Sequence, residues 1–220
     1  MADLTHIDTW LFDLDHTLYP STVPVLRLIE GRIRDYMVRL TGLPADEAWA
    51  VQRGYLADYG GAVAGLVKHY GIEPHAFLAE VHDVPVDSLS ADLELRHALA
   101  RLPGRRLIFT NGSARHAERV LERLAIADLF EAVFHTEAAN MIMKPDPRAF
   151  TALIAAHAID PQTTAFFEDR AVNLEPAAKL GMTTILVGPE AAASTDAFVQ
   201  HRTPTLAPFL DAARVKEPAL

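Results

Sequence analysis

The chain contains no cysteine among its 220 residues. Disulfide bonds, thiolate metal sites and a phosphatase mechanism with a cysteine nucleophile are therefore excluded. An excess of basic residues is also lacking, because the formal net charge is −9. A nucleic acid is therefore not an expected partner, since binding to a phosphate backbone usually requires a basic face.

Long apolar runs are missing as well. No stretch of about 18 uninterrupted apolar residues is present, so neither a membrane span nor a membrane partner is expected. The first ten residues show no basic region followed by an apolar one, so no secretory signal is expected and we predict a cytoplasmic protein. Half of the residues are hydrophobic, which indicates a globular chain with one substantial core. We expect a monomer or a small homo-oligomer.

Short apolar runs with β-branched and aromatic residues recur along the chain. They are "WLFDLD", "RRLIFTN", "EAVFH", "TTAFFED" and "TTILVG". Such runs are typical of strands buried on both faces, and from about residue 91 onward segments with helical periodicity separate them. This alternation predicts an α/β fold, with a Rossmann-like, three-layer core built on a parallel sheet.

About 85 residues between the first and second predicted strands show helical periodicity throughout. Apolar residues recur there at steps of three and four, and glycines such as Gly42 are placed to end helices. The segment is too long for a simple crossover, so we interpret residues 21–90 as an inserted all-helical cap. Residues 1–20 and 91–220 then form the core, and the last ten residues, from Asp211, are predicted to be a frayed tail.

Asp13 and Asp15 follow the first predicted strand and lie two residues apart, on the same side of an extended chain. Open α/β sheets place their sites at the carboxyl ends of such strands. One carboxylate there can attack a phosphoryl group, and the other can act as general acid and base if its neighbours raise its pKa. The alternative is a strand end with two solvated aspartates.

Thr110, Asn111 and Gly112 end the second predicted strand just before a helix. A hydroxyl, an amide and free backbone N–H groups at this point form a candidate phosphate-binding corner. The alternative is an ordinary turn capped by Ser113. Lys144, directly before another predicted helix, is a candidate cation for the same phosphate, although most single lysines are solvated surface residues.

Glu168 and Asp169 close a buried run, and an acidic pair there is costly unless a cation is present. Hard oxygen ligands suit Mg²⁺, with Mn²⁺ as an alternative ion. An acidic first helical turn that complements the helix dipole is the competing interpretation. If the strand ends meet, four carboxylates face one lysine, so we expect Mg²⁺ and a proton on Asp15 to balance the charge.

These motifs, in this order, resemble those of the haloacid dehalogenase superfamily of phosphatases. The resemblance implies that Asp13 is the nucleophile and Asp15 the acid/base, with Lys144 orienting the nucleophile. It places Thr110, Asn111, Gly112 and Lys144 at the substrate phosphate and Asp13, Asp15 (through its backbone carbonyl) and Asp169 at Mg²⁺. Some members carry a further acid where this chain has Asn173, so Asn173 and Glu168 are left without an assigned role.

A finer resemblance is to the pyrimidine 5'-nucleotidase branch, carried by "FDLDHTLYPST", "LIFTNGSARHAERVLERLAI" and "FFEDRAVNLEPAAKLGMTTILVG". It implies hydrolysis of small monoesters such as UMP and CMP through an aspartyl-phosphate. The alternatives are a sugar-phosphate or phosphoglycolate phosphatase, a non-catalytic phosphate-binding protein and a 2-haloacid dehalogenase, which Asp15 disfavours. Several cap residues are candidates for contacting a base or sugar: Arg53, Tyr55, Tyr59, Lys68, His69 and Tyr70.

Overall fold

A parallel six-stranded sheet forms the centre of the computed structural model, which describes residues 1–216. The strand order is β4-β3-β2-β5-β6-β7, and every neighbouring pair is parallel. The strands are β2 (Thr9–Phe12), β3 (Arg105–Phe109), β4 (Ala132–Phe134), β5 (Thr164–Glu168), β6 (Thr183–Val187) and β7 (His201–Thr203). The predicted α/β fold with a parallel sheet is confirmed.

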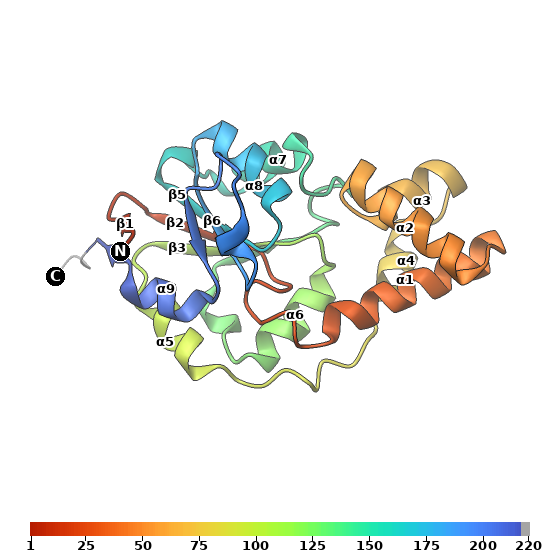
Figure 1. Ribbon diagram of the computed structural model, residues 1–220, viewed down its shortest axis with the longest axis horizontal. Helices are drawn as coiled ribbons and strands as arrows, with labels where there is room; N and C mark the ends of the chain where they lie inside the picture. The colour runs from red at the N-terminus through yellow and green to blue at the C-terminus, as the bar shows by residue number, and fades with distance from the viewer. Residues whose placement is uncertain (217–220) are drawn as a thin grey trace.

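Helices cover both faces of this sheet (Figure 1). They are α5 (Leu93–Ala100), α6 (Ala114–Arg123), α7 (Pro147–His157), α8 (Ala171–Leu180) and α9 (Leu206–Ala212). Successive residues of β2 point to opposite faces. Phe12 belongs to the hydrophobic cluster that includes residues of α5, α6 and α9, whereas Leu11 belongs to the cluster that includes residues of α7 and α8. The sheet is therefore the middle of three layers, as the sequence predicts.

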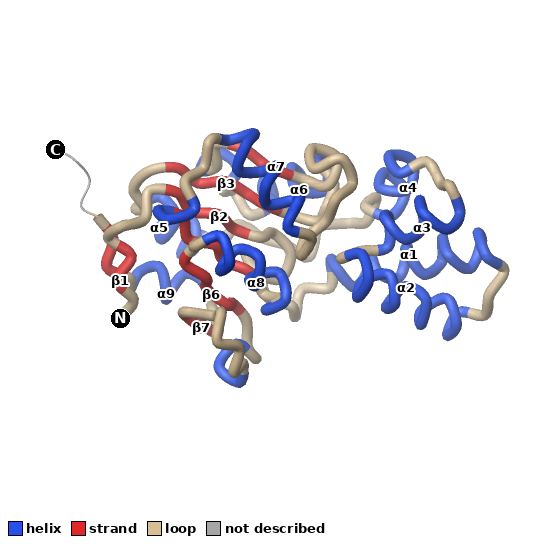
Figure 2. Tube along the Cα trace, turned by 90° about the horizontal axis from the view of Figure 1, so that it is seen from above, coloured by secondary structure: helices blue, strands red, loops and turns tan. Residues whose placement is uncertain are grey.

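Four further helices pack on one another beyond the end of the sheet (Figures 1 and 2). They are α1 (Val25–Thr41), α2 (Ala45–Tyr59), α3 (Ala62–Tyr70) and α4 (Pro74–Val81). They share a separate hydrophobic cluster that includes Met37, Leu66 and Phe77. We call this group the cap, and we propose that it is the inserted unit at residues 21–90.

Residues 211–216 are more ordered than the sequence predicts. The predicted frayed tail from Asp211 is wrong for the described part, because α9 continues to Ala212 and β8 (Arg214–Val215) pairs with β1 (Asp3–Leu4). The rest of that tail lies outside the described residues. Strands of two or three residues, such as β1, β7 and β8, are too short to give a periodic pattern. Within residues 1–216, no helix is both long and apolar enough to cross a membrane.

Candidate active site

The residues singled out by the sequence meet at the carboxyl edge of the sheet. Asp13 directly follows β2, Thr110 directly follows β3, and Glu168 is the last residue of β5. The parallel register brings these three ends together, because Phe12 is paired with both Ile108 and Phe167. A cavity of about 330 Å³ opens there between the sheet and the cap. All the candidate residues of the core line it: Asp13, Asp15, Thr110, Asn111, Gly112, Lys144, Glu168, Asp169 and Asn173.

Lys144 is the best-anchored of these side chains. Its Nζ donates to Asp13 Oδ1 at 2.7 Å, to Glu168 Oε2 at 2.7 Å and to the Phe109 carbonyl at 2.8 Å. The side chain is 1% exposed, so all three ammonium hydrogens are used inside the protein. Burial alone would lower the pKa of Lys144, but the adjacent carboxylates raise it above its ordinary value. Lys144 therefore stays cationic and fixes one oxygen of Asp13.

Asp13, Glu168 and Asp169 form an acidic cluster, each with a carboxylate oxygen within 4.8 Å of those of the others. Burial and the charges of Glu168 and Asp13 raise the pKa of Asp169 far above its ordinary range. Burial and the charge of Glu168 raise the pKa of Asp13 as well, although Lys144 opposes the shift. Raised carboxyl pKa values mean that the surrounding side chains do not fully neutralise the negative charge of the cluster. Its oxygen donors and excess negative charge suit a divalent cation such as Mg²⁺.

Asp15 differs from what the sequence predicts. Burial would raise its pKa, but the imidazole of His116 and a hydrogen bond from the Tyr19 hydroxyl lower the pKa to about 2. The His116 Nε2 lies 2.8 Å from Asp15 Oδ1, which Tyr19 also contacts. An ionised carboxylate only accepts hydrogen bonds, so the imidazole Nε2–H donates. The expectation that neighbouring residues raise the pKa of Asp15 is therefore wrong for the substrate-free protein.

His116 and His82 are site residues that the sequence analysis missed. His116 is fully buried on α6, and its ring stacks on that of His82, at the end of α4, with centroids 5.1 Å apart. Burial is the main reason why the pKa of His82 falls to about 4. The only local signal for His116 was its place on the helix that follows the Thr110 corner. Its proximity to Asp15, across 101 positions of sequence, is a property of the fold.

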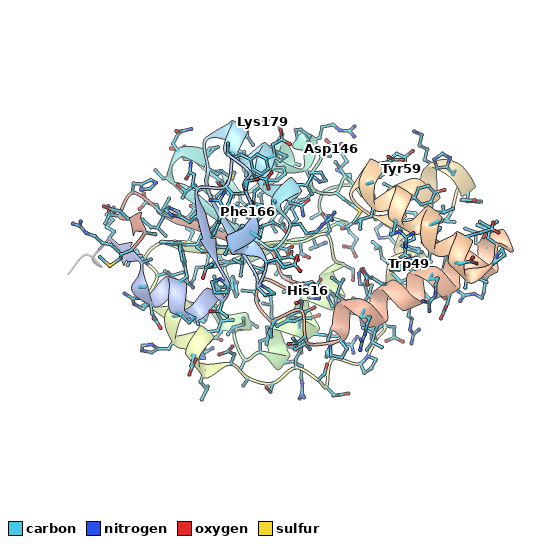
Figure 3. The ribbon with its side chains drawn as sticks, in the orientation of Figure 1. His16, Trp49, Tyr59, Asp146, Phe166 and Lys179 are labelled. Atoms are coloured by element: carbon cyan, nitrogen blue, oxygen red, sulfur yellow. The ribbon has the colours of Figure 1, made fainter. Side chains whose placement is uncertain are left out.

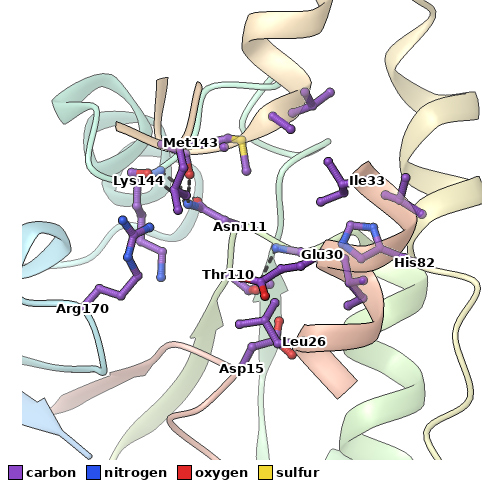
Figure 4. Close-up of a pocket in the computed structure, with 18 of the residues that line it drawn as sticks. Asp15, Leu26, Glu30, Ile33, His82, Thr110, Asn111, Met143, Lys144 and Arg170 are labelled. Atoms are coloured by element: carbon purple, nitrogen blue, oxygen red, sulfur yellow. Dashed lines mark hydrogen bonds between the residues drawn. The ribbon is translucent and has the colours of Figure 1, made fainter. Parts of the chain in front are cut away.

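The Thr110 corner is formed at the start of α6. Thr110 Oγ1 accepts a hydrogen bond from the Gly112 N–H at 2.9 Å, and Ser113 caps the helix by accepting from the His116 N–H. The predicted helix cap at Ser113 is therefore confirmed, whereas phosphate binding at the Thr110 corner stays a prediction. Figure 4 shows Thr110 between Asp15 and Asn111 on the wall of the cavity.

The cap covers the cavity with a mainly apolar wall. Its residues there are Leu26, Ile29, Glu30, Ile33, Trp49, Gln52, Arg53, Leu56, Gly60, Gly61, Ala62, Val63, Phe77, Leu78, Val81 and His82. Trp49 comes from the same helix as Tyr59, and Figure 3 shows the two at different places on the cap. Arg53 lies over the Trp49 ring, 5.4 Å from its centroid.

Of the six cap residues expected to contact a base or sugar, only Arg53 lines the cavity. Tyr55 is two positions further along α2, which turns it by about 200° around the helix axis. It stacks on His69, with the ring planes 4° apart. The Tyr59 hydroxyl accepts a hydrogen bond from Lys68. Five of the six therefore lie outside the cavity wall: Tyr55, Tyr59, Lys68 and His69 contact one another within the cap, and Tyr70 is exposed. Whether a residue of α2 faces the cavity depends on its rotation around the helix axis and not on its type.

Comparisons with known proteins show the family and the fold of the chain. A family model described as "haloacid dehalogenase-like hydrolase" matches residues 7–181. The curated relative "Phosphate metabolism protein 8" of Saccharomyces cerevisiae is 29% identical over 191 residues, which cover 79% of this chain. The chain spans only 59% of that relative's length.

Solved structures with the same fold include a phosphatase and a dehalogenase. A HAD phosphatase from Thermococcus onnurineus is 18% identical with a TM-score of 0.61, over 93% of this chain and 97% of that one. A 2-haloacid dehalogenase from Pseudomonas syringae is 22% identical with a TM-score of 0.60, over 94% and 98%. At these identities the likeness shows the shared fold alone.

Proposed function

The chain belongs to the haloacid dehalogenase-like hydrolase family, and on that premise we propose that it is a metal-dependent phosphatase of pyrimidine nucleoside 5'-monophosphates. The observation that carries the proposal is the arrangement of Asp13 and Asp15. Both line one cavity, where Asp13 is bound to the buried ammonium of Lys144. A fixed carboxylate nucleophile with a second carboxylate beside it is what two-step phosphate-ester hydrolysis requires.

In the first proposed step, Asp13 attacks phosphorus. Its Oδ1 is held by Lys144, whereas Oδ2 has only a long contact of 3.5 Å from the Thr17 hydroxyl, so Oδ2 is the available nucleophile. The bond from phosphorus to the ester oxygen breaks, and Asp15 gives a proton to that oxygen. A substrate dianion beside Asp15 raises the carboxyl pKa by like-charge repulsion, which favours the protonated acid at this moment.

In the second proposed step, Asp15 takes a proton from a water molecule, and the water oxygen attacks the aspartyl-phosphate. Inorganic phosphate leaves and Asp13 is regenerated. The Asp15 Oδ1 is held by His116 and Tyr19, so Oδ2, which lies on the side of Gly112, is the oxygen that exchanges the proton. The Thr110 corner contacts the transferring phosphoryl oxygens, and the positive charge of Lys144, whose hydrogens stay on protein acceptors, stabilises their negative charge through space.

The Asp13 and Asp169 carboxylates and the Asp15 backbone carbonyl are proposed to hold Mg²⁺ or Mn²⁺. The raised pKa values of Asp13 and Asp169 support this assignment, since a nearby cation removes their mutual repulsion. When bound, the ion neutralises charge on the phosphate and on the acidic cluster. Glu168 acts indirectly: its Oε2 accepts a hydrogen bond from Lys144 Nζ at 2.7 Å and so helps to hold the ammonium in place.

The apolar cap wall supports a nucleotide over a sugar phosphate. Trp49, Leu56 and Phe77 offer flat and aliphatic surface of the kind that a planar base covers well. Nucleotides and sugar phosphates both carry sugar hydroxyl groups, but only a nucleotide adds a planar base that this apolar surface can cover. The volume of the cavity is within the range of small-molecule sites, roughly 300–1,000 Å³.

A phosphate-release panel tests the proposal. UMP, CMP, dUMP, AMP, phosphoglycolate and sugar phosphates are compared with Mg²⁺ and with EDTA, using an Asp13→Asn protein as the control. We expect Mg²⁺-dependent release that is fastest from the pyrimidine monophosphates. Release from phosphoglycolate or sugar phosphates alone would refute the nucleotide assignment, and a folded protein inactive on every ester would refute the enzymatic proposal.

A further inference from the structure

The turn between α2 and α3 of the cap rests directly on the loop that carries Lys144. Gly60 ends α2 with φ +77°, and a Cβ at this position would overlap the Lys144 carbonyl group. A Cβ on Gly61 would overlap the side chain of Met143. At Gly60 the cap therefore meets the core backbone to backbone, and this approach requires a glycine, whereas the flexible end of Met143 could move away from a side chain at position 61.

The side-chain amide of Asn111 joins the same two segments. Its Nδ2 donates to the Gly60 carbonyl at 3.3 Å and to the Lys144 carbonyl at 3.0 Å. Its Oδ1 accepts from the Lys144 N–H at 2.8 Å. Figure 4 shows Asn111 between the Lys144 loop and the Thr110 corner. Both amide hydrogens are therefore occupied, which leaves this side chain no donor for a substrate phosphate while the cap is in place.

We propose that Asn111 is a positioning residue that couples the docked cap to the placement of Lys144. The amide fixes both the N–H and the C=O of Lys144, and the ammonium of the same residue lies between Asp13 and Glu168. Movement of Gly60 away from the core removes one of the amide's partners and frees the loop that presents the ammonium. Contact with the cap thus organises the core site. The structural coupling between the cap and Lys144 does not depend on the proposed function. Its effect on catalysis rests on the proposed function.

The chain offers a matched control for this coupling. Gly71 ends α3 with φ +64°, close to the φ of Gly60, but a Cβ at Gly71 would meet no atom within 4 Å. Alanine imposes similar backbone strain at both positions, whereas only Gly60→Ala pushes the cap off the Lys144 loop. The Gly71→Ala protein therefore reports strain in the cap without loss of the contact.

The first measurement is backbone hydrogen–deuterium exchange of the peptide containing Lys144, in the full chain without substrate. We expect about tenfold faster exchange in Gly60→Ala and in Asn111→Ser, and wild-type exchange in Gly71→Ala. Unchanged exchange in Asn111→Ser, or equal acceleration in Gly60→Ala and Gly71→Ala, overturns the coupling. Because this measurement requires no substrate, its result remains valid even if the protein proves not to be a nucleotidase.

The second measurement is the kcat for acetyl phosphate, whose leaving group is too small to need the cap wall. If the cap positions Lys144, Gly60→Ala lowers this kcat by about tenfold to a hundredfold, while Gly71→Ala leaves it unchanged. A role of the turn in substrate binding alone would raise KM for UMP and leave kcat for acetyl phosphate at the wild-type value. That result overturns the proposal. Asn111→Ser provides the same test if Gly60→Ala does not fold.

Discussion

The core side and the cap side of the cavity are built in opposite ways. On the core side, charged groups are buried and tied by short contacts, as in the pairs that Lys144 makes with Asp13 and Glu168. On the cap side, the wall is mainly apolar, and the helices that form it also leave large side chains such as Leu28, Leu40 and Tyr70 exposed.

From this difference we infer that the core side carries out the chemistry and that the cap side selects the leaving group. Fixed ion pairs hold the reacting groups in one geometry, which is what chemistry on any phosphate ester needs. An apolar surface selects a leaving group by its shape, and it tolerates amino-acid substitution better than the buried ion pairs do. Substitutions in the core should therefore act on kcat and on stability, and substitutions of the apolar side chains in the cap wall should act on KM. The Gly60 turn is the exception, because it touches the loop that carries Lys144.

The largest expected effect is the loss of the nucleophile. Asp13→Asn keeps the shape of the side chain but removes the attacking carboxylate, so we expect kcat to fall by on the order of 10⁴-fold or more. The variant should stay folded, because it also removes a charge that Glu168 repels. Phosphate release and thermal unfolding are measured together, and substantial remaining turnover would exclude Asp13 as the nucleophile.

The next largest effect tests the buried charges. Lys144→Met leaves Asp13 and Glu168 without their cation, and breaking a buried pair costs about 3–5 kcal/mol of unfolding free energy. Urea unfolding at pH 8 in EDTA measures the loss. Arg53→Met, at the cap wall, is the comparison and should stay within about 1 kcal/mol of wild type. Equal losses in both variants would contradict the contrast between core and cap.

The third expected effect concerns metal and pH. Carboxyl pKa values that are raised on folding, as at Asp13 and Asp169, make the folded state bind more protons than the unfolded state. The contribution of the acidic cluster to the stability of the metal-free protein should therefore fall as pH rises from about 4 through neutrality, and His82, whose pKa is lowered on folding, opposes this trend below about pH 6.5. Mg²⁺ should raise the melting temperature more at pH 8 than at pH 5, and scanning fluorimetry with Mg²⁺ or EDTA checks this. An equal shift at both pH values would speak against a metal at the cluster.

The smallest expected effect lies in the cap. Trp49→Ala removes aromatic surface from the wall, so we expect KM for UMP to rise about tenfold, equivalent to ~1.4 kcal/mol. The kcat for acetyl phosphate should not change. Tyr70→Ala is the control, because Tyr70 lies on the cap, 44% exposed, and is not part of the cavity wall. A lower kcat for acetyl phosphate in Trp49→Ala would contradict the assignment of catalysis to the core side and of leaving-group recognition to the cap side.

Much of the fold follows from local pattern. The runs that became β2, β3, β4, β5 and β6 were recognisable because each is short and rich in apolar residues, and β2, β5 and β6 are buried along their whole length. The cap helices were recognisable by their three- and four-residue spacing. The two-residue strands β1 and β8 were missed, because pairing between distant chain ends leaves no periodic signal. For the same reason, the prediction of a frayed tail from Asp211 was wrong.

The sequence by itself determined which groups stand at the carboxyl edge of the sheet, and the strand order brought β2, β3 and β5 side by side. Asp13, Thr110 and Glu168 stand at strand ends, and parallel strands bring their carboxyl ends to one edge whatever the details of packing. Only the tertiary structure decided how those groups are charged and held. His116, on α6, lowers the pKa of Asp15, which lies after β2. On α2, Arg53 faces the cavity and Tyr55 does not, because the two residues point in different directions around the helix axis. Periodicity is set by neighbours in the chain, whereas burial and electrostatic fields depend on residues that only folding brings near.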